Sequence, residues 1–266
     1  MIPIYAPELN EISSDYPADA YAGLAEIEAR SFWFIWRNRI IQHFFRRHVG
    51  TGESKVLEIG CGTGFVMKGL SENFPLYAMH GADIHVAGME FAQNRLPHAK
   101  FFQLDASQMP FTNEFSAVGM FDSLEHISDD EGVIRGVHQA LESMGLFLIT
   151  VPQHQFLWSH EDDLGGHKRR YSRLDLCGKL QRNGFRLLCT TSFVSTLFPL
   201  LCVTRLIGRM QSQSKEQVLT KAGYQLAPPP LLNSLVSLAM GLDYFLIRLG
   251  IFLPFGGSLL VVAQKT

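Results

Sequence analysis

The sequence predicts an α/β fold with a doubly wound, mostly parallel sheet, on three observations. Short apolar runs alternate with segments of helical periodicity between residues 54 and 151, which is the order of elements in such folds. The runs are apolar throughout, as expected of strands covered by helices on both faces. The first run ends in a turn with glycine at alternate positions, Gly60, Gly62 and Gly64. Such a turn can lead a buried strand sharply into a helix.

Helices are predicted before the first strand. Residues 21–48 show apolar side chains at mixed helical spacing with arginines between them, whereas residues 1–20 are polar and contain prolines. We expect residues 1–20 to be loosely ordered. The aromatic run 32–36 has two interpretations: its rings pack onto the sheet, or one or two of them close an active site. Arg37, next to this run, could then pair with a carboxylate of a ligand.

The glycine turn is the most informative motif and reads E-x-G-x-G-x-G from Glu58 to Gly64. Its glycines let a ligand approach the backbone without a Cβ in the way. The helix that follows, expected over residues 64–72, offers free N–H groups to a negatively charged ligand group. In a dinucleotide-binding turn the third glycine would stand at Phe65, so a nicotinamide oxidoreductase is disfavoured.

Acidic residues stand at the ends of the next three predicted strands. These strands are expected over residues 76–84, 101–106 and 117–121, and their acids are Asp83, Asp105 and Asp122. The carboxyl ends of parallel strands meet at one edge of the sheet, where ligands of open α/β sheets bind. Carboxylates at this edge could accept hydrogen bonds from the hydroxyl groups of a nucleoside.

The same alternation of elements continues to the end of the chain. Further helices are expected over 86–95, 129–143 and 172–182, and further strands over 146–151, 185–190 and 258–263. Gly145 is expected to end the second of these helices. Ser172 and Asp175 are expected to cap the third.

Composition limits the classes of function. A net charge of −2 leaves no basic field for steering nucleic acid, so no nucleic-acid partner is expected. The four cysteines form no CxxC pair and no Cys/His metal spacing, which favours reduced thiols in a cytoplasmic protein. We find no basic segment followed by an apolar run at the N-terminus and no uniformly apolar stretch of membrane-spanning length, so neither a signal peptide nor a membrane span is expected.

The motif from Glu58 to Gly64, together with Asp83 and Asp105, resembles the class I S-adenosylmethionine-dependent methyltransferases. The segment from Asp122 to Ile127 is close to the LEH stretch of the ubiquinone-biosynthesis O-methyltransferases. This resemblance implies a Rossmann-like sheet of seven strands, with the last strand antiparallel between strands five and six. It also implies that the helices before the first strand form a cap over the site.

The resemblance implies a binding site for S-adenosylmethionine, which leaves as S-adenosylhomocysteine. In that family Asp83 would accept hydrogen bonds from the ribose, while Asp105 and the next backbone N–H would meet the adenine. Glu58 would support the loop and the amino end of the donor. The residues expected to bind the donor are Arg37, Glu58, Gly60, Cys61, Gly62, Gly64, Asp83, Ile84, Asp105, Ala106, Phe121 and Asp122.

Three histidines are candidates for the base that takes a proton from the acceptor: His126, His154 and His167. A neutral imidazole is suited to this role, although His126 could instead be structural. The spacing of Asp122, Glu125 and His126 also matches a metal cluster of the ubiquinone-type relatives. Such a set would suit a transition metal better than Mg²⁺, and the site we expect contains no metal.

The loop over residues 151–171 is long, and long loops in compact domains are usually functional. Its stretch from Asp162 resembles a D-x-x-x-G-H-x-R-R-Y sequence of uncharacterised bacterial methyltransferases. Arg169 and Arg170 could hold a carboxylate or a phosphate of the acceptor. Alternatively, Asp162, His167 and Arg170 bind one another and tie the loop down as a buried network.

The expected function is therefore methyl transfer from S-adenosylmethionine to a small-molecule acceptor, with oxygen favoured as the accepting atom. The alternative is a non-catalytic protein that binds S-adenosylmethionine or S-adenosylhomocysteine without turnover. We expect three parts: a helical cap (1–50), the S-adenosylmethionine-binding domain (51–193 and 256–266), and a helical insert (194–255).

The insert departs from the minimal fold. It contains two apolar helical segments, 194–210 and 230–250, which are separated by a polar stretch and three prolines. In the second segment, apolar residues step by four and three to form a seam for another helix: Leu231, Leu235, Leu238, Leu242, Phe245 and Leu249. The two helices could pack on each other and on the domain, form a homodimer, or act as a lid that contacts a lipid-like substrate or a membrane surface.

Overall fold

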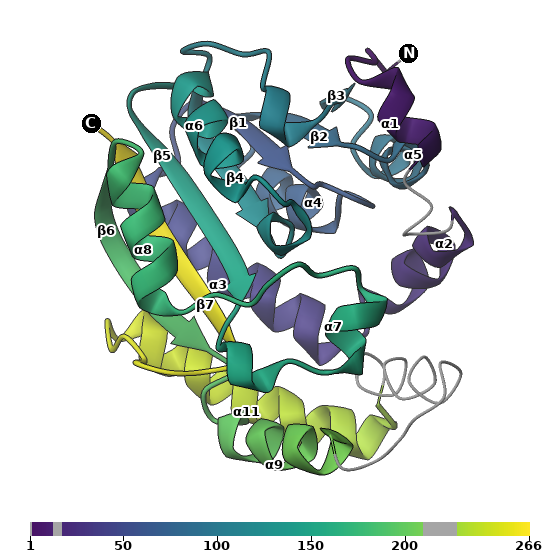
Figure 1. The fold of residues 1–266 in the computed structure, drawn as a ribbon, viewed down its shortest axis with the longest axis vertical. Helices are drawn as coiled ribbons and strands as arrows, with labels where there is room; N and C mark the ends of the chain where they lie inside the picture. Colours follow the sequence, from purple (N-terminus) through teal and green to yellow (C-terminus); the bar gives the residue numbers. More distant parts are fainter. Residues whose placement is uncertain (1, 13–17, 210–227) are drawn as a thin grey trace.

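A seven-stranded sheet forms the centre of the molecule (Figure 1), in the order β3-β2-β1-β4-β5-β7-β6. The computed structural model describes residues 2–12, 18–209 and 228–266. Strands β3, β2, β1, β4 and β5 are parallel to one another. Strand β7 runs antiparallel between β5 and β6. The predicted Rossmann-like fold class, including the antiparallel last strand, is confirmed.

The strands cover most of the expected ranges, but several boundaries differ. They are β1 Ser54–Ile59, β2 Tyr77–Asp83, β3 Lys100–Gln103, β4 Phe115–Phe121, β5 Leu141–Pro152, β6 Phe185–Phe193 and β7 Ser258–Lys265. Strand β3 is shorter than predicted and ends before Asp105. Strands β6 and β7 are longer because they pair with each other over nearly their whole length, which single-strand patterns do not reveal.

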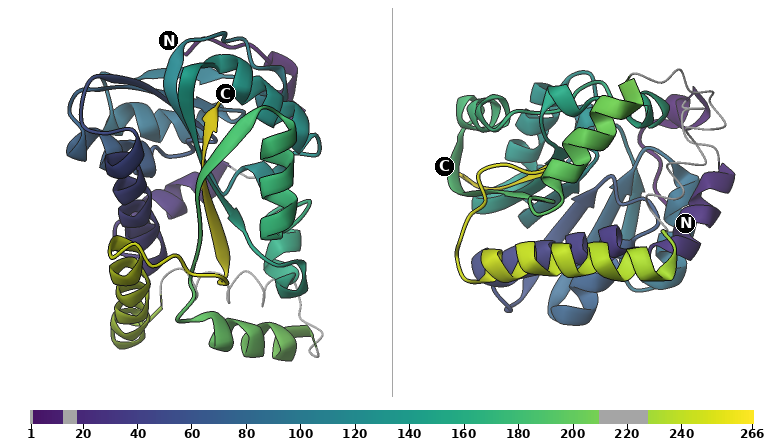
Figure 2. Two further views of the ribbon diagram at one scale, coloured as in Figure 1. Left: turned by 90° about the vertical axis from the view of Figure 1, so that its left-hand side faces the viewer. Right: turned by 90° about the horizontal axis from the view of Figure 1, so that it is seen from below.

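Helices cover both faces of the sheet (Figures 1 and 2) and bury two apolar clusters. One face carries α3 Phe32–His48, α4 Phe65–Asn73 and α5 Val86–Arg95; the other carries α6 Asp130–Ala140 and α8 Arg173–Arg182. Successive side chains of a strand point to opposite faces. Val56 of β1 therefore lies in the first cluster, whereas Leu57 lies in the second.

The N-terminal segment is more ordered than the sequence indicated. It contains α1 Pro7–Ile12 and α2 Ala18–Ile27, and the predicted helix 21–48 is interrupted between α2 and α3. Residues before α1 attach to the end of β3: Ile4 forms a bridge with Gln103, whose side-chain amide bonds to the backbone N–H and C=O of Ala6. The expectation of a loosely ordered residue range 1–20 is wrong for this part, because a distant strand end supplies its hydrogen bonds.

The predicted helix 129–143 is also wrong at its end. Helix α6 ends at Ala140, and β5 begins at once with Leu141, which pairs with Phe115. Gly145 lies inside β5, where the pairing shifts register, and does not cap a helix. The capping of α8 is as predicted, because the Ser172 hydroxyl accepts a hydrogen bond from the backbone N–H of Asp175.

The insert between β6 and β7 contains α9 Phe198–Arg209 and α11 Pro230–Arg248. The polar stretch predicted between them lies mostly outside the described residues. Helix α11 packs along α3, where the Trp36 indole donates a hydrogen bond to the Ser237 hydroxyl and Met240 is buried. The buried Asp243 carboxylate accepts hydrogen bonds from the backbone N–H groups of Ser195 and Thr196. These contacts fix α11 at the surface of the domain.

The six seam residues, five in α11 and Leu249 just after it, are exposed in the part of the chain that the structure describes. Each is 48–77% exposed: Leu231, Leu235, Leu238, Leu242, Phe245 and Leu249. We call these residues the leucine seam. Helix α9 likewise exposes Leu200, Val203, Leu206 and Ile207. Helix α11 does pack on α3 and β6, as one of the expected alternatives held, but it does so through the face that carries Met240 and Asp243 and not through the leucine seam. Among the described helices α11 is long and apolar enough to cross a membrane by length and composition, which the sequence reading did not anticipate.

Candidate active site

The loop between β1 and α4 has the backbone that the glycine motif predicted. Gly60, Gly62 and Gly64 have φ angles of +72°, +47° and +75°, which favour glycine. A Cβ at Gly60 would lie 2.2 Å from the Ser123 Oγ, and one at Gly64 would lie 2.8 Å from the Ala92 Cβ. A Cβ at Gly62 would meet nothing within 4 Å. Two glycines are thus required by packing, while Gly62 faces open space in front of the loop.

Asp83, at the end of β2, fastens this loop. One carboxylate oxygen accepts from the Gly62 N–H at 2.8 Å and the other from the His85 N–H at 2.9 Å. Burial raises the pKa of Asp83, and these two N–H groups oppose the rise. Because each carboxylate oxygen accepts more than one hydrogen bond, the predicted contact with a ribose remains compatible with this geometry.

Glu58 and Arg37 each present an unsatisfied buried group at the base of the same loop. One Glu58 oxygen and the Arg37 Nε have no hydrogen-bond partner among the described residues. Burial raises the pKa of Glu58 to about 8, although Arg37 opposes the rise. Buried polar groups are normally paired, so these two atoms are available for the predicted contacts with a ligand that has an amino group and a carboxylate. The amino-acid end of S-adenosylmethionine has both.

Arg37 also forms an ion pair that the sequence did not predict. Its Nη1 lies 2.5 Å from a carboxylate oxygen of Asp122, which follows β4 with a φ of +52°. The pair joins α3 of the N-terminal cap to the carboxyl edge of the sheet. The contact with a donor carboxylate predicted for Arg37 stays a prediction, for which its Nε–H is available.

Asp105 lies outside a strand and caps the short helix η1 Ala106–Gln108, where its carboxylate accepts from the Ser107 N–H at 2.8 Å. Nearby, the Gln103 side chain also donates to the Ile84 carbonyl. The N-terminal segment that Gln103 holds therefore borders the predicted adenine position. Neither Gln103 nor Ala6 was singled out in the sequence, because their pairing joins distant segments.

A second contact missed in the sequence holds the glycine loop against α2. The buried Glu28 carboxylate accepts from the Thr63 hydroxyl at 2.6 Å and from Arg95 at 2.7 Å. Inside the loop, the N–H of Cys61 donates to the Ala82 carbonyl. Burial raises the pKa of the Cys61 thiol well above its usual range, so this thiol is unreactive.

The turn after β4 carries the first candidate base on η2 Leu124–His126. Burial, followed by the neighbouring His167, lowers the pKa of His126 to about 4, so its ring is neutral at neutral pH. Burial also raises the pKa of Glu125 well above its usual range, and the Asp122 charge adds to this. One Glu125 oxygen has no hydrogen-bond partner among the described residues.

The structure brings together a different trio from the one that spacing indicated. One ligand atom each of Glu125, His126 and His167 lies within 4.8 Å of the others, and the two imidazole rings are 4.7 Å apart at 88°. These residues could hold a metal ion. Asp122, which the spacing placed in the trio, pairs with Arg37 instead.

Asp162 organises the long loop that follows β5. Its buried carboxylate accepts from the His167 Nδ1 at 2.8 Å, from the Arg170 Nε at 2.8 Å, and from the backbone N–H and hydroxyl of Ser159. Burial alone would raise its pKa, but the His167 hydrogen bond and the Arg170 charge hold the pKa at about 2. The network predicted as one of two alternatives is therefore present. The network uses the His167 Nδ1, and the His167 ring packs edge-on against the ring of His126 in the turn after β4.

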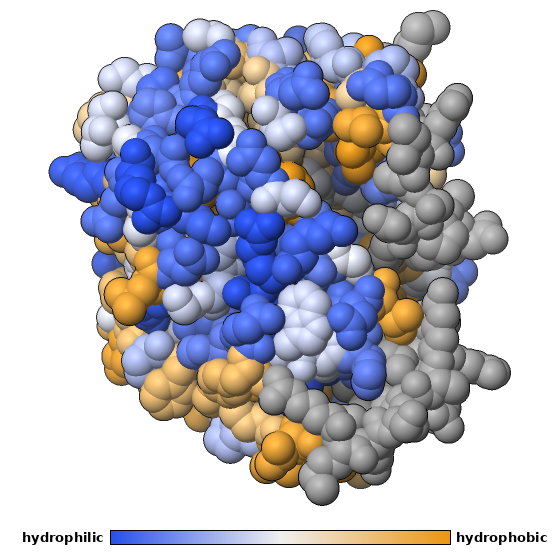
Figure 3. Space-filling model, viewed as in Figure 1, coloured by the Kyte–Doolittle hydropathy of each residue, from blue (hydrophilic) through white to orange (hydrophobic). Residues whose placement is uncertain are grey.

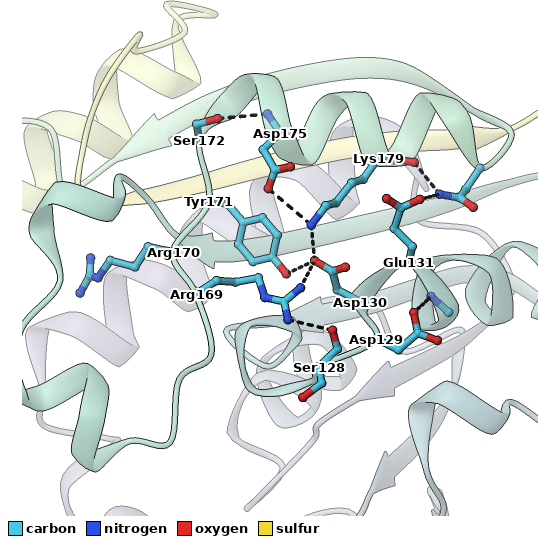
Figure 4. Close-up of polar contacts among 12 residues, drawn as sticks. Ser128, Asp129, Asp130, Glu131, Arg169, Arg170, Tyr171, Ser172, Asp175 and Lys179 are labelled. Atoms are coloured by element: carbon cyan, nitrogen blue, oxygen red, sulfur yellow. Dashed lines mark hydrogen bonds and ion pairs between the residues drawn. The ribbon is translucent and has the colours of Figure 1, made fainter.

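A second carboxylate, Asp130, binds Arg169 of this loop and Lys179 of α8 (Figure 4). One of its oxygens accepts from the Tyr171 hydroxyl at 2.8 Å, from Lys179 at 2.6 Å and from Arg169 at 2.8 Å. Arg169 also donates to the Ser128 carbonyl. With Arg170 paired to Asp162, both arginines predicted to hold an acceptor anion are engaged in internal ion pairs. That expectation is not supported by the structure.

His154 lies apart from the other two histidines in its contacts. It has a φ of +66°, and its ring stacks on Phe156 and lies against Phe198 at 5.0 and 5.5 Å. Burial, followed by the charge of Arg170, lowers its pKa. Its Nε2 has no hydrogen-bond partner among the described residues. The structure thus brings His126 and His167 together and leaves His154 against aromatic rings, including one of α9.

Comparison with known proteins agrees with this geometry. A family model described as a methyltransferase domain matches residues 29–190. The chain belongs to the class I S-adenosylmethionine-dependent methyltransferases. S-adenosylmethionine is the cofactor of this family, and the residues of this methyltransferase fit it: Gly62 leaves open space where a Cβ would stand, and Glu58 and Arg37 offer unpaired polar atoms to its amino-acid end. The roles of single residues stay predictions.

Three relatives illustrate the range of likeness. Demethylmenaquinone methyltransferase of Thermotoga maritima is 28% identical over 115 residues, 43% of this chain and 48% of the relative. Ubiquinone biosynthesis O-methyltransferase of Chromobacterium violaceum is 30% identical over 107 residues, 35% of this chain and 41% of the relative. The solved structure of Haemonchus contortus phosphoethanolamine N-methyltransferase 2 with S-adenosyl-L-methionine has a TM-score of 0.64 at 15% identity and covers 97% of this chain and 60% of that one.

The matches to curated relatives cover only part of each protein. This methyltransferase spans about half the length of the curated relatives it matches. At 15% identity, the likeness to the solved structure is one of fold. The family match covers β1 to β5 and the glycine loop; it ends at residue 190 and so leaves out the insert and β7.

Proposed function

We propose that this protein transfers the methyl group of S-adenosylmethionine to an oxygen atom of a small-molecule acceptor. The observation that carries the proposal is the position of the Asp162–His167 pair beside the turn after β4. That turn also supplies Asp122, the partner of Arg37. A candidate base and the donor-side residues therefore approach the same turn.

On the donor side, we assign Asp83 to the ribose hydroxyls and Asp105, with the N–H of Ala106, to the adenine. Glu58 and Arg37 take the amino and carboxylate groups of the methionine part. Their unpaired buried atoms support this assignment. The donor's positive charge disappears during methyl transfer, so these carboxylates should hold its periphery and not its sulfur.

On the acceptor side, we assign the base to His167. An imidazole whose Nδ1–H donates to a carboxylate keeps Nε2 free to accept a proton, and the carboxylate steadies the imidazolium that forms. Bound S-adenosylmethionine supplies an electrophilic methyl group, whose bond to sulfur breaks as a bond to the acceptor oxygen forms. The hydroxyl proton moves to the His167 Nε2. His126, whose pKa is low, would position the acceptor, as would His154.

The ubiquinone-type relative supports oxygen as the accepting atom by its printed name, whereas the phosphoethanolamine relative is named for nitrogen. A screen with a tritium-labelled donor and a metabolite extract tests the proposal. The expected result is a labelled product whose methyl group is released as methyl iodide by boiling hydriodic acid, which removes methyl groups from oxygen but not from carbon or, under these conditions, from nitrogen. Donor binding without any labelled product across extracts would favour the non-catalytic alternative.

Donor binding has a simpler test that needs no acceptor. S-adenosylhomocysteine at a hundred times its Kd should add about 2.7 kcal/mol to the free energy of unfolding, whereas NAD at the same concentration should add nothing. Stabilisation by NAD alone would overturn the proposal. A thermal-shift titration of both compounds measures this.

Two further parts of the proposal concern the whole chain. All four cysteines are free thiols, which supports a reducing, cytoplasmic setting. We propose the same division of the chain as above, with a cap (1–50), a domain (51–193 and 256–266) and an insert (194–255). The exposed seam of α11 supports a partner at the insert, either a second copy or a lipid surface.

A further inference from the structure

The insert carries a broad apolar surface that methyl transfer does not explain. It consists of the leucine seam of α11, the four exposed apolar residues of α9, and Phe252 and Phe255, which are 41% and 52% exposed. We call this surface the apolar base. In the right panel of Figure 2, α9 and α11 both lie on the face seen from below, apart from each other, and Figure 3 shows hydrophobic residues along the lower edge. Exposed apolar patches of this extent mark sites of protein or membrane interaction.

Cations border the apolar base, and carboxylates are nearly absent from it. The sequence of α3, α9, α11 and residues 249–257 contains a single acidic residue, Asp243, which is buried. Exposed arginines lie beside α11: the Arg47 guanidinium is 5.9 Å from the Phe252 ring, and that of Arg248 is 5.8 Å from Tyr244. Arg39 stacks on Trp36 at 4.5 Å, next to α11. The surface is therefore apolar at its centre and positive at its border.

We propose that the apolar base docks onto a membrane that contains anionic phospholipids. A helix with leucines and aromatic residues on one face and arginines beside it binds the interface between headgroups and acyl chains. In the view from below, α11 lies in front of α3. The leucines would then enter the acyl boundary while the long side chains of Arg39 and Arg47 reach the headgroups.

The charges favour a lipid surface over a second copy of the chain. A twofold interface places the same surface on both sides, so a second copy would bring further arginines and no carboxylate from these segments to pair with them. Anionic headgroups supply the missing negative charge. Although α11 is long enough to span a bilayer, its inner face is fixed on α3 by Trp36 and Met240, so it lies in the interface.

Vesicle flotation tests this proposal independently of catalysis. The full chain should float with vesicles of phosphatidylcholine and phosphatidylglycerol, and much less with phosphatidylcholine alone. The double variant L235Q/L238Q should lower the partition coefficient at least tenfold, because two leucines that enter the acyl boundary are replaced. A matched control is L76Q/M144Q, which changes two apolar residues of comparable exposure (55% and 56%, against 59% and 74%) at the opposite end of the sheet. This control should float like the parent.

A charge variant completes the test. R47Q/R248Q should lower the partition coefficient about fivefold for each arginine replaced, on the anionic vesicles only. Added salt should lower the partition coefficient of the parent protein to the same level. Equal flotation of the parent and L235Q/L238Q would overturn the proposal. So would a parent that floats with neither vesicle, or a dimer by light scattering that L235Q/L238Q converts to a monomer without any vesicle binding. S-adenosylhomocysteine binding by each variant shows that its fold is intact.

Discussion

The donor side and the acceptor side of the candidate active site are built in different ways. On the donor side, the glycine loop is held through backbone N–H groups, as when Gly62 donates to Asp83 at the end of β2. On the acceptor side, His167 and Arg170 converge on one buried carboxylate, that of Asp162. Donor geometry thus follows from strand ends and backbone conformation, whereas acceptor geometry depends on a charged network. Substitutions on the first side should change ligand affinity, and those on the second should change turnover and stability.

The sharpest division between the two sides is expected from H167A. Removal of a general base should lower kcat by roughly 100- to 10,000-fold, while the affinity for S-adenosylhomocysteine stays within about threefold of the parent. The measurements are turnover with the acceptor found in the extract screen and calorimetry with the product. H160A is the control, because His160 is exposed and makes a loose 3.8 Å contact with Asp163. Unchanged turnover in H167A would mean that His167 is not the base and contributes only to the hydrogen-bond network of Asp162.

The next largest effect is expected on stability. In D162A the buried Arg170 and His167 lose their common partner, so the free energy of unfolding should fall by about 3–5 kcal/mol. Urea denaturation measures this loss. The neighbouring variant D163A removes an exposed carboxylate that accepts from the Trp158 indole and should cost less than about 1 kcal/mol. Similar losses in both variants would contradict the central role of Asp162.

On the donor side, D83A should weaken S-adenosylhomocysteine binding by roughly 10- to 150-fold, since hydrogen bonds to a charged group contribute about 1.5–3 kcal/mol. Calorimetry measures the change. E90A removes an exposed acid of the neighbouring helix α5 and should bind like the parent. If D83A also binds like the parent, the ribose assignment is wrong.

The smallest effects concern pH. The pKa of Glu58 is raised from 4.5 to about 8, so the folded state holds a proton that the unfolded state releases, and stability falls as pH rises through this range. The pKa of His126 is lowered from 6.5 to about 4, so its contribution is lost as pH falls through that range. Each slope is at most about 1.4 kcal/mol per pH unit.

Two variants separate these slopes in urea denaturation at several pH values. E58Q should reduce the loss of stability as pH rises above 4.5 and leave the loss of stability as pH falls below 6.5 unchanged. H126N should reduce only the loss of stability as pH falls below 6.5. A parent-like slope in E58Q would mean that Glu58 is already ionised in the folded protein.

The two sides also differ in how far the sequence predicted them. Gly60, Gly62 and Asp83 were predictable because a turn and a strand end fix them within a short segment. The antiparallel last strand was implied by the family resemblance, and the structure confirms it. The ion pair of Arg37 with Asp122 was not predictable, because it joins a cap helix to the far end of β4.

Elsewhere the sequence misled for identifiable reasons. The heptad-like spacing of Leu231 and Leu235 predicted burial, but spacing does not say which face of α11 meets α3. The buried face of α11 carries Met240 and the acid Asp243. A pattern of apolar residues does not predict that an acid occupies a buried position. For Asp122, sequence proximity to Glu125 suggested a shared site, whereas its positive φ turns the side chain toward the cap.

The close approach of Ser123 to Gly60 has a consequence for attempts to redesign the acceptor preference. A Cβ on Gly60 would overlap the Ser123 hydroxyl. A bulkier residue at position 123 would therefore displace the glycine loop. Variants from a library that randomises the turn after β4 should therefore bind S-adenosylmethionine more weakly as well as change their acceptor preference. Diversity is better introduced at Phe156, an exposed residue of the loop after β5 whose ring lies against those of His154 and Phe198.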